Sequence, residues 1–332
     1  IVWLHFVVHN VLAFLPLALY ATDRLLAQPR ARWWALLTAC LASQFLGGHP
    51  ETSVLFALVW GSFTLVRINW RGQALRSLGL IGLACFAAVG LVLPQLWPTI
   101  NLIPASGSFA RRTSEQYLSL INGGLGTWRN LRNWLFIINP YMYGTPLGNR
   151  YLDSRTIYHG MVAYLGVLSV PWIVAGMVGG RSRRIGVYWT LVALISLTLT
   201  FPLPGFDRLL MLPVLNIGNG IRFILSWSLA ASVLAGLGVD WVLRSGRGAR
   251  WLVGGVGTAC VALLYASVYD LATAANGSWV LGGTPGPTIL RRIAAFYNRD
   301  SLQLLGLLGS ALIGWALLAA LVFTRRRTAA AG

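Results

Sequence analysis

A short polar turn interrupts an otherwise apolar stretch and carries two groups capable of acid–base chemistry. In FLGGHPETSV, residues 45–54, His49 and Glu51 lie two positions apart between apolar runs. A carboxylate can take a proton from a hydroxyl group, and an imidazole titrates near neutral pH. Ionisable groups at membrane depth are costly and usually mark a functional site. Glu51 is therefore a candidate catalytic residue, and His49 is a candidate substrate-binding residue.

The same turn also has a purely structural interpretation. Gly47 and Gly48 would end one helix, and Pro50 would take the first position of the next, where its missing N–H costs nothing. The negative charge of Glu51 would interact favourably with the positive N-terminus of that second helix. This interpretation gives His49 no role, so both interpretations stay open.

The expected length of the flanking helices bears on this choice. Between Arg32 and Arg67 the chain must cross the membrane twice, which leaves about 15 residues, or about 22 Å, for each helix. The hydrocarbon core of a bilayer is about 30 Å thick. The turn is therefore predicted to lie below the outer surface, where a polar backbone is tolerated only against protein or a water-filled cavity.

A second polar cluster occupies residues 138–160, INPYMYGTPLGNRYLDSRTIYHG. Asp153 and His159 are candidate acids or bases, and Arg150 and Arg155 could hold a phosphate by forked hydrogen bonds. Asn139 and Tyr143 are further substrate-binding candidates. An ordinary solvated loop with local ion pairs is the alternative for any one of these residues.

A third candidate element is LPVLNIGNGIRF, residues 212–223, in which Arg222 precedes an apolar run. Arg222 could extend its charged group to the membrane interface or bind an anionic lipid head group. Because all three elements are expected on one side of the membrane, we hypothesise that they line one outward-facing cavity. Its members would be His49, Glu51, Asn139, Tyr143, Asp153, His159 and Arg222.

The composition places these residues in a membrane protein. The chain has 332 residues, 56% of them hydrophobic and 10% charged, with a mean hydropathy of +0.67. All basic residues are arginine, and the formal charge is +18. The arginines cluster in short gaps between apolar runs, which orients a membrane protein and argues against nucleic-acid binding. The cysteines, Cys40, Cys85 and Cys260, lie far apart, so their spacing indicates no metal site and no disulfide framework.

The apolar runs predict an all-α polytopic membrane protein, a bundle of about nine transmembrane helices forming one domain over residues 1–332. The helices are expected at about 1–20, 33–47, 52–66, 77–94, 160–178, 185–201, 222–240, 251–270 and 302–323. Arginine triplets follow every second helix and place those gaps, and the C-terminus, on the cytoplasmic side. The first residue would then lie outside without a signal peptide, so we expect further N-terminal helices before Ile1.

The longest predicted outer segment is residues 98–158. Within it Trp128, Leu131, Leu135 and Ile138 recur at helical spacing, with arginine and asparagine residues between them. That pattern is typical of an interfacial helix with an apolar face in lipid and a cationic face toward the headgroups. Such a helix could brace the structure or contact a substrate.

Several of these segments together resemble the YfhO-like family of bacterial membrane proteins, which belongs to the GT-C clan of lipid-linked-sugar glycosyltransferases. The matching segments occur in the family's order and cover most of residues 10–245: FLPLAL (14–19), LGGHPET (46–52), LPQLWP (93–98), INPYMYG (138–144), LPVLNIGNGIRF (212–223) and LAGLGVD (234–240).

The resemblance implies a GT-C-like fold and an enzyme of the bacterial cytoplasmic membrane. Its donor would be a polyprenyl-phosphate-linked sugar, and its acceptor a cell-envelope glycan or a teichoic-acid-type polymer at the outer face. Membrane lipids would surround it. A carboxylate would deprotonate the acceptor, while cationic groups or a divalent metal would steady the leaving phosphate. In the clan this carboxylate usually lies in a first large outer loop, which residues 1–332 lack, so we expect it to be absent from this chain.

Two alternatives to a glycosyltransferase stay open. A transporter or flippase of a lipid-linked glycan would share the apolar groove and outer arginines, and broken helices in both halves would favour it. A non-catalytic envelope scaffold would leave the polar outer residues scattered. No P-loop, GxSxG, HExxH or ferredoxin-type cysteine motif points to a cofactor or a soluble-enzyme mechanism.

Overall fold

A computed structural model describes residues 6–105, 128–141, 163–179, 183–212, 215, 220–245, 247–273 and 301–324. Over these ranges the protein is helical and contains no strand, as the apolar runs predict. Four of the described helices are long and apolar enough to cross a membrane, namely Asn10–Ala27, Ala74–Leu102, Gly220–Arg244 and Gly248–Tyr269. The chain is therefore a helical, membrane-embedded protein.

The contacts within the chain divide it into two compact units. Unit 1 comprises Ile1–Leu120 and Arg208–Arg222, and unit 2 comprises Ile121–Asp207 and Phe223–Gly332. Unit 1 contains the turn at residues 45–54 and most of the segment 212–223, and unit 2 contains the segment 138–160. The prediction of one transmembrane domain over the whole chain stays a prediction.

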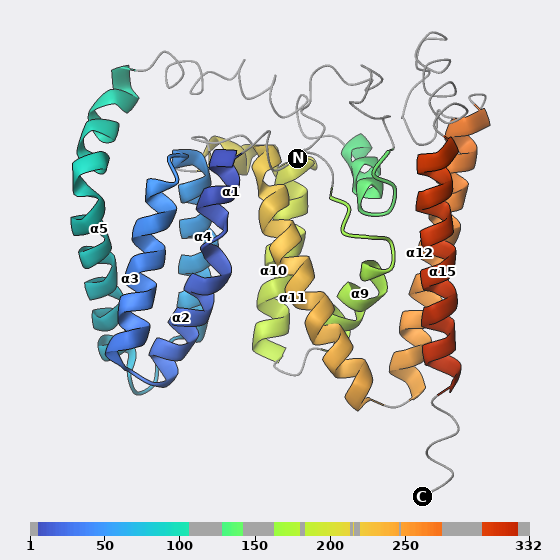
Figure 1. Cartoon of the computed structure of the whole chain (residues 1–332), viewed down its shortest axis with the longest axis horizontal. Helices are drawn as coiled ribbons and strands as arrows, with labels where there is room; N and C mark the ends of the chain where they lie inside the picture. The colour runs from blue at the N-terminus through green and yellow to red at the C-terminus, as the bar shows by residue number, and fades with distance from the viewer. Residues whose placement is uncertain are drawn as a thin grey trace, which may run out of the picture. The chain divides into compact units, whose positions relative to one another are not determined.

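The described residues of unit 1 form five helices and two short 3-10 turns (Figure 1). In chain order the helices are α1 (Phe6–Leu12), α2 (Leu15–Ala27), α3 (Ala31–Leu46), α4 (Pro50–Arg67) and α5 (Ala74–Ala105). The turn η6 (Gly220–Arg222) and most of η4 (Asp207–Met211) also belong to this unit. Helix α3 packs against both α2 and α5, and α4 packs against α1 and α2.

Two helices of unit 1 run further than the hydropathy pattern predicts. The first was expected to end near residue 20, but α2 continues to Ala27 and includes Asp23 and Arg24. The fourth was expected to end at residue 94, but α5 has 32 residues and continues through Pro94 and Pro98 to Ala105. Charged residues end an apolar run without ending a helix, and proline is tolerated in membrane helices.

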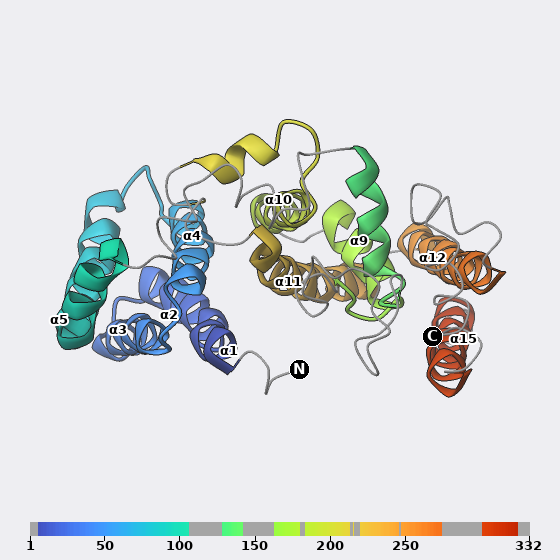
Figure 2. The same ribbon diagram turned by 90° about the horizontal axis from the view of Figure 1, so that it is seen from above.

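Unit 2 contains the remaining described elements, seen from above in Figure 2. They are η2 (Trp128–Ile137), α9 (Ser169–Gly179), α10 (Arg183–Thr200), α11 (Phe223–Arg244), α12 (Arg247–Thr273) and α15 (Ser301–Thr324). Helix α11 packs along both α9 and α10, and α12 packs on α9 and α15. Every run predicted to span the membrane thus contains a helix.

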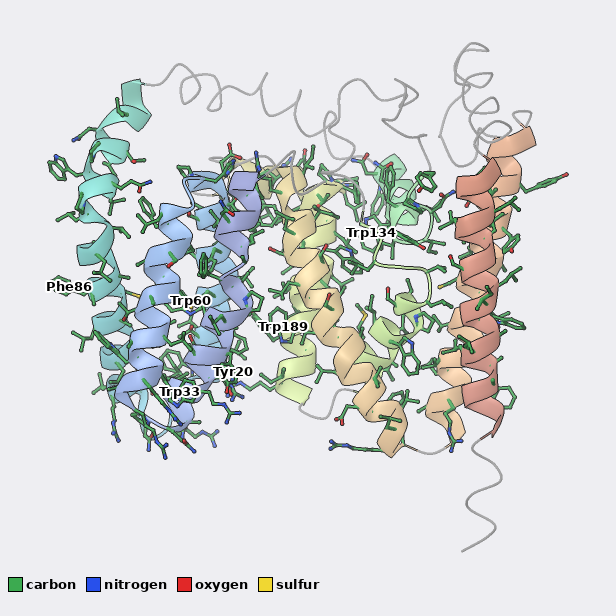
Figure 3. The ribbon with its side chains drawn as sticks, viewed as in Figure 1. Tyr20, Trp33, Trp60, Phe86, Trp134 and Trp189 are labelled. Atoms are coloured by element: carbon green, nitrogen blue, oxygen red, sulfur yellow. The ribbon has the colours of Figure 1, made fainter. Side chains whose placement is uncertain are left out.

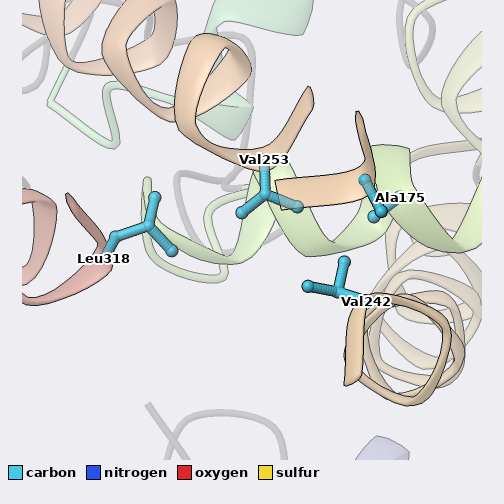
Figure 4. Packing of buried hydrophobic residues seen from close by; sticks show 5 residues of the cluster. Ala175, Val242, Val253 and Leu318 are labelled. Atoms are coloured by element: carbon cyan, nitrogen blue, oxygen red, sulfur yellow. The ribbon is translucent and has the colours of Figure 1, made fainter. Parts of the chain in front are cut away.

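Glycine residues let α9 and α11 approach closely. A Cβ atom added at Gly176 of α9 would overlap the backbone carbonyl of Leu234, and one added at Gly238 of α11 would overlap the carbonyl of Trp172. Beside this contact lies an apolar cluster that also joins α12 and α15 (Figure 4). Its buried members are Ala175, Val242, Ala249, Val253 and Leu318. Small residues at such crossings are typical of membrane helices, whose backbones pack closely.

The predicted fifth helix, 160–178, is partly wrong. Residues 163–168 are not helical, Gly166 has a φ of +95°, and α9 begins only at Ser169. The carbonyl of Ala163 accepts a hydrogen bond of 2.9 Å from the indole Nε1 of Trp227 on α11. The carbonyl of Gly166 accepts one of 2.7 Å from the hydroxyl of Ser169. These contacts satisfy backbone groups that a helix would otherwise pair internally.

The helix predicted around residues 128–138 is present as the 3-10 helix η2, and its position at the membrane interface stays a prediction. Trp128 and Leu131 are exposed, as an apolar lipid-facing side requires, but Phe136 is fully buried and stacks on Phe201 with ring centroids 6.2 Å apart. Asn130 Nδ2 donates a 2.6 Å hydrogen bond to the carbonyl of Pro202. Of the two roles considered for this helix, these contacts favour a structural brace. Residues 98–105 of the predicted outer segment 98–158 belong to α5. Residues 106–127 and 142–158 lie outside the described residues.

Candidate functional site

The turn between α3 and α4 follows the structural interpretation of the sequence. Gly47 follows the last residue of α3, Gly48 takes a φ of +77° that suits glycine, and Pro50 is the first residue of α4. A Cβ atom at Gly47 would lie 2.8 Å from Cγ2 of Val11 in α1, so the turn also packs against α1.

His49 has the structural role that the sequence analysis did not find. It is the N-cap of α4, and its Nδ1 accepts a 3.3 Å hydrogen bond from the backbone N–H of Thr52. The Thr52 hydroxyl lies 2.9 Å from the same nitrogen. Histidine is an uncommon N-cap, but its ring nitrogen satisfies a backbone donor of the first turn as an Asp or Ser oxygen would. His49 as a substrate-binding residue stays a prediction.

Glu51 forms an ion pair with Arg222, which lies far away in the sequence. The distance between Glu51 Oε2 and Arg222 Nε is 2.7 Å, and the two side chains are 6% and 27% exposed. Both residues belong to unit 1, Glu51 in the first turn of α4 and Arg222 at the end of η6. The ion pair therefore joins the LGGHPET and LPVLNIGNGIRF segments.

The helices flanking the turn are short, as predicted. Helix α3 has 16 residues and α4 has 18, or about 24 and 27 Å at 1.5 Å per residue. Helix α5 of the same unit continues well beyond the turn in Figure 1. The Glu51 side chain is thus buried at a turn that does not reach the end of its neighbouring helix.

Asn139 lies in unit 2, where its hydrogen bonds are structural. Asn139 is buried, with 1% of its surface exposed. Its Nδ2 donates a 3.0 Å hydrogen bond to the Ser267 hydroxyl on α12, and its Oδ1 accepts a 3.0 Å bond from the N–H of Tyr141. The latter contact is an Asx-turn, which shapes the chain after η2. A substrate-binding role for Asn139 stays a prediction.

The other predicted site residues lie outside the described residues: Tyr143, Arg150, Asp153, Arg155 and His159. The structure thus brings Glu51 and Arg222 together, with His49 in the same turn. It leaves the predicted seven-residue cluster untested.

Sequence reasoning missed several polar residues near the turn. Thr52 completes the His49 cap through its backbone N–H and its hydroxyl, and the His–x–x–Thr spacing matches no capping-box signal. Gln44 Oε1 and Ser53 Oγ are buried and have no hydrogen-bond partner within the described residues. Buried polar atoms without partners are uncommon in folded proteins. No spacing rule marks these two residues, because their burial depends on how the helices pack.

The described residues contain no group of three or more His, Cys, Asp or Glu side chains placed to hold a metal ion. The divalent metal implied by the family resemblance therefore stays an expectation. What the described geometry offers is a positive guanidinium, held by a buried carboxylate, at the end of a helical hairpin.

Comparison with known proteins adds no assignment: no protein-family model, no curated protein and no solved structure matches this chain. The resemblance to the YfhO-like family accordingly stays a prediction from its motifs.

Proposed function

We propose that this chain is a GT-C-like glycosyltransferase of the bacterial cytoplasmic membrane. It would move a sugar from a polyprenyl-phosphate carrier to a cell-envelope acceptor at the outer face. In this proposal about nine helices span the membrane and the C-terminus is cytoplasmic. The observation that carries it is the ion pair between Glu51 and Arg222. This ion pair connects two of the segments on which the family resemblance rests.

The cost of such an ion pair supports a functional role. Removing two charges from water is expensive, and apolar residues of similar volume often stabilise a protein equally well. The chain has only eight acidic residues in all, yet it buries one of them at this turn. Ionisable groups among membrane helices commonly mark a substrate path.

The geometry suggests a division of roles between the two residues. A guanidinium has five N–H donors in a rigid fork that matches phosphate oxygens. The contact with Glu51 is made through Nε of Arg222. We assign the carrier phosphate to Arg222 and the positioning of that guanidinium to Glu51. Asp153 and His159 remain the candidates for proton transfer.

One observation favours a transporter or flippase of a lipid-linked glycan as the second candidate. Residues 163–168 of unit 2 are not helical although the hydropathy pattern predicts a helix there. Interrupted membrane helices often bind substrate in transporters, because their free backbone groups line the path. The α3–α4 turn of unit 1, predicted to be recessed, and this interrupted segment of unit 2 would together form the arrangement expected of this candidate.

The deciding experiment is a transfer assay in proteoliposomes, using full-length protein and a radiolabelled sugar on polyprenyl phosphate. We expect Glu51→Gln and Arg222→Gln each to lower transfer about 100-fold, as the loss of one aligned charged group does in other enzymes. Asp240→Asn is the matched control, because it removes the carboxylate of an exposed ion pair, 2.6 Å from Arg244. Its rate should stay within about twofold of wild type, as expected for a weak surface pair.

The possible results separate the candidates. Transfer that is insensitive to both site variants contradicts the assignment of the site. Movement of the lipid-linked sugar across the bilayer without any transfer, abolished by the same variants, supports the transporter. Neither transfer nor movement, in a folded protein with the full donor set, supports the scaffold.

A further inference from the structure

One end of unit 1 carries a dense positive charge that the proposed function does not use. It is formed by the C-terminal ends of α2 and α4, the N-terminal ends of α3 and α5, and the turns between them. The arginines there are Arg24, Arg30, Arg32, Arg67, Arg71 and Arg76. The acidic residue at this end, Asp23, is already in an ion pair with Arg67. The surface therefore keeps a large excess of positive charge.

Two of these arginines lie over a pair of aromatic rings. Tyr20 of α2 and Trp33 of α3 meet edge to face, with centroids 5.6 Å apart and an interplanar angle of 88°. The guanidinium of Arg24 lies 5.2 Å from the Tyr20 ring, and that of Arg32 lies 4.5 Å from the Trp33 ring. In Figure 3 the Tyr20 and Trp33 side chains lie at the end of unit 1 where side-chain nitrogen atoms gather.

Both parts of this arrangement match the chemistry of a phospholipid headgroup. Tyrosine and tryptophan favour the membrane–water interface, where their rings can contact acyl chains. The indole Nε1 of Trp33 is buried in the protein, so Trp33 would contribute its ring face and not its N–H group. A guanidinium stacked on a ring keeps its N–H groups in its own plane, at the edge, where they can bind phosphate oxygens bidentately. Arg24 and Arg32 are both exposed. Basic sites between membrane helices are known to bind anionic headgroups.

The start of α3 adds to this attraction. Its N-cap residue, Arg30, makes no side-chain capping hydrogen bond, and the first turn contains no acidic residue. A helix N-terminus carries a partial positive charge and normally attracts an acid there. Two arginines at this position raise the local potential further, which an anion from outside the protein would relieve.

We propose that the surface formed by Tyr20, Arg24, Arg32 and Trp33 binds the phosphate of an anionic phospholipid. We call this surface the arginine–aromatic site. The rings support the glycerol and upper acyl region, while the two guanidinium groups hold the phosphate oxygens from either side. The ligand is a membrane lipid and not free phosphate, because the rings contribute only when an apolar chain is attached.

Native mass spectrometry of the full chain, titrated with phosphatidylglycerol or with phosphatidylcholine, tests this proposal. A surface arginine contributes about fivefold in affinity for an anionic lipid, so Arg24→Gln with Arg32→Gln should weaken phosphatidylglycerol binding about 30-fold. Arg184→Gln is the matched control, because Arg184 is an exposed arginine at the second position of α10, as Arg32 is at the second position of α3. The control should change binding less than about fivefold.

Three further results decide the interpretation. Equal weakening by Arg184→Gln and by Arg32→Gln alone would mean that net charge, not this site, controls binding, and would overturn the proposal. Inorganic phosphate that displaces the lipid at millimolar concentration would identify a headgroup-only site and also overturn it. Weaker binding by Trp33→Leu, with unchanged helix content by circular dichroism, would support the contribution of the ring.

Discussion

Two helix pairs in this protein are held together in opposite ways. In unit 1, α2 and α4 are joined by polar side chains: Trp60 Nε1 donates a 2.8 Å hydrogen bond to the Thr22 hydroxyl, and Arg67 pairs with Asp23. In unit 2, α9 and α11 are joined by backbone proximity at Gly176 and Gly238. The contact between α2 and α4 depends on the polar groups of its side chains. The contact between α9 and α11 depends on the absence of a side chain at Gly176 and Gly238.

The difference indicates where each unit tolerates change. A polar contact between helices survives a modest change in shape but not the loss of one partner, since the remaining polar group is left buried. A glycine contact is indifferent to charge but fails when a single carbon is added. At these two contacts, unit 1 should therefore be sensitive to the loss of a polar or charged group and unit 2 to an increase in size.

The ion pair between Glu51 and Arg222 should give the largest effect. Removing one partner of a buried pair leaves the other charge uncompensated, so Glu51→Ala should lower the free energy of unfolding by about 3 kcal/mol. The double variant with Arg222→Ala should lose less than the sum of the single variants. Unfolding titrations in SDS-containing mixed micelles measure both. In the exposed Asp240–Arg244 pair, Asp240→Ala should cost at most about 0.5 kcal/mol.

If the Glu51 and Asp240 variants lost equal stability, the buried pair would contribute no more than a surface pair. This result would contradict the proposal that unit 1 is especially sensitive to the loss of a charged group.

Two glycines of α11 provide the corresponding test in unit 2. Gly238→Ala should lower the free energy of unfolding by about 2 kcal/mol, because the added methyl group overlaps the Trp172 carbonyl and must push α9 away. Gly236 lies two residues earlier on the same helix and has open space around its Cβ position. Gly236→Ala should therefore be neutral or stabilise by up to about 1 kcal/mol through helix propensity. Destabilisation of similar size by both changes would show that close packing at Gly238 is not the cause.

Apart from the control variants, the smallest effect is expected at His49. Loss of an N-cap typically costs about 1 kcal/mol, so His49→Ala should lower the stability of unit 1 by that amount. Asn is a good N-cap, so His49→Asn should retain the stability that His49→Ala loses. In the sugar-transfer assay the same two variants separate a cap from a binding residue. A cap predicts that His49→Asn keeps wild-type transfer, whereas a substrate contact predicts that both variants lose it.

Much of the fold was predictable because it depends on local patterns. The glycines before His49 and the proline after it marked the α3–α4 turn to the residue, since helix ends have local sequence rules. The runs of apolar residues located every described α-helix, although the first run contains two helices, α1 and α2. The errors concern boundaries at which tertiary contacts occur: α2 continues past Asp23, which pairs with Arg67, and α9 begins after Ala163, whose carbonyl accepts a hydrogen bond from Trp227.

The candidate site was less predictable. A lone arginine before a helix is most simply expected to reach the membrane interface, and no local signal pointed from Arg222 to Glu51. Their pairing depends on the packing of segments far apart in the chain. The role of His49 was missed for a different reason, because N-cap rules are built on oxygen acceptors and a ring nitrogen does not appear in them.

The close contact between α9 and α11 has a consequence for how the chain is made. Helix α9 has 11 residues, about 17 Å, which is too short to cross a bilayer about 30 Å thick by itself. Its glycine partner, Gly238, is synthesised only after the whole of α10. The ribosome must therefore deliver α9 to the insertion machinery well before its partner exists. Stable insertion of α9 should therefore wait for α11, whose Gly238 supplies the close contact with α9.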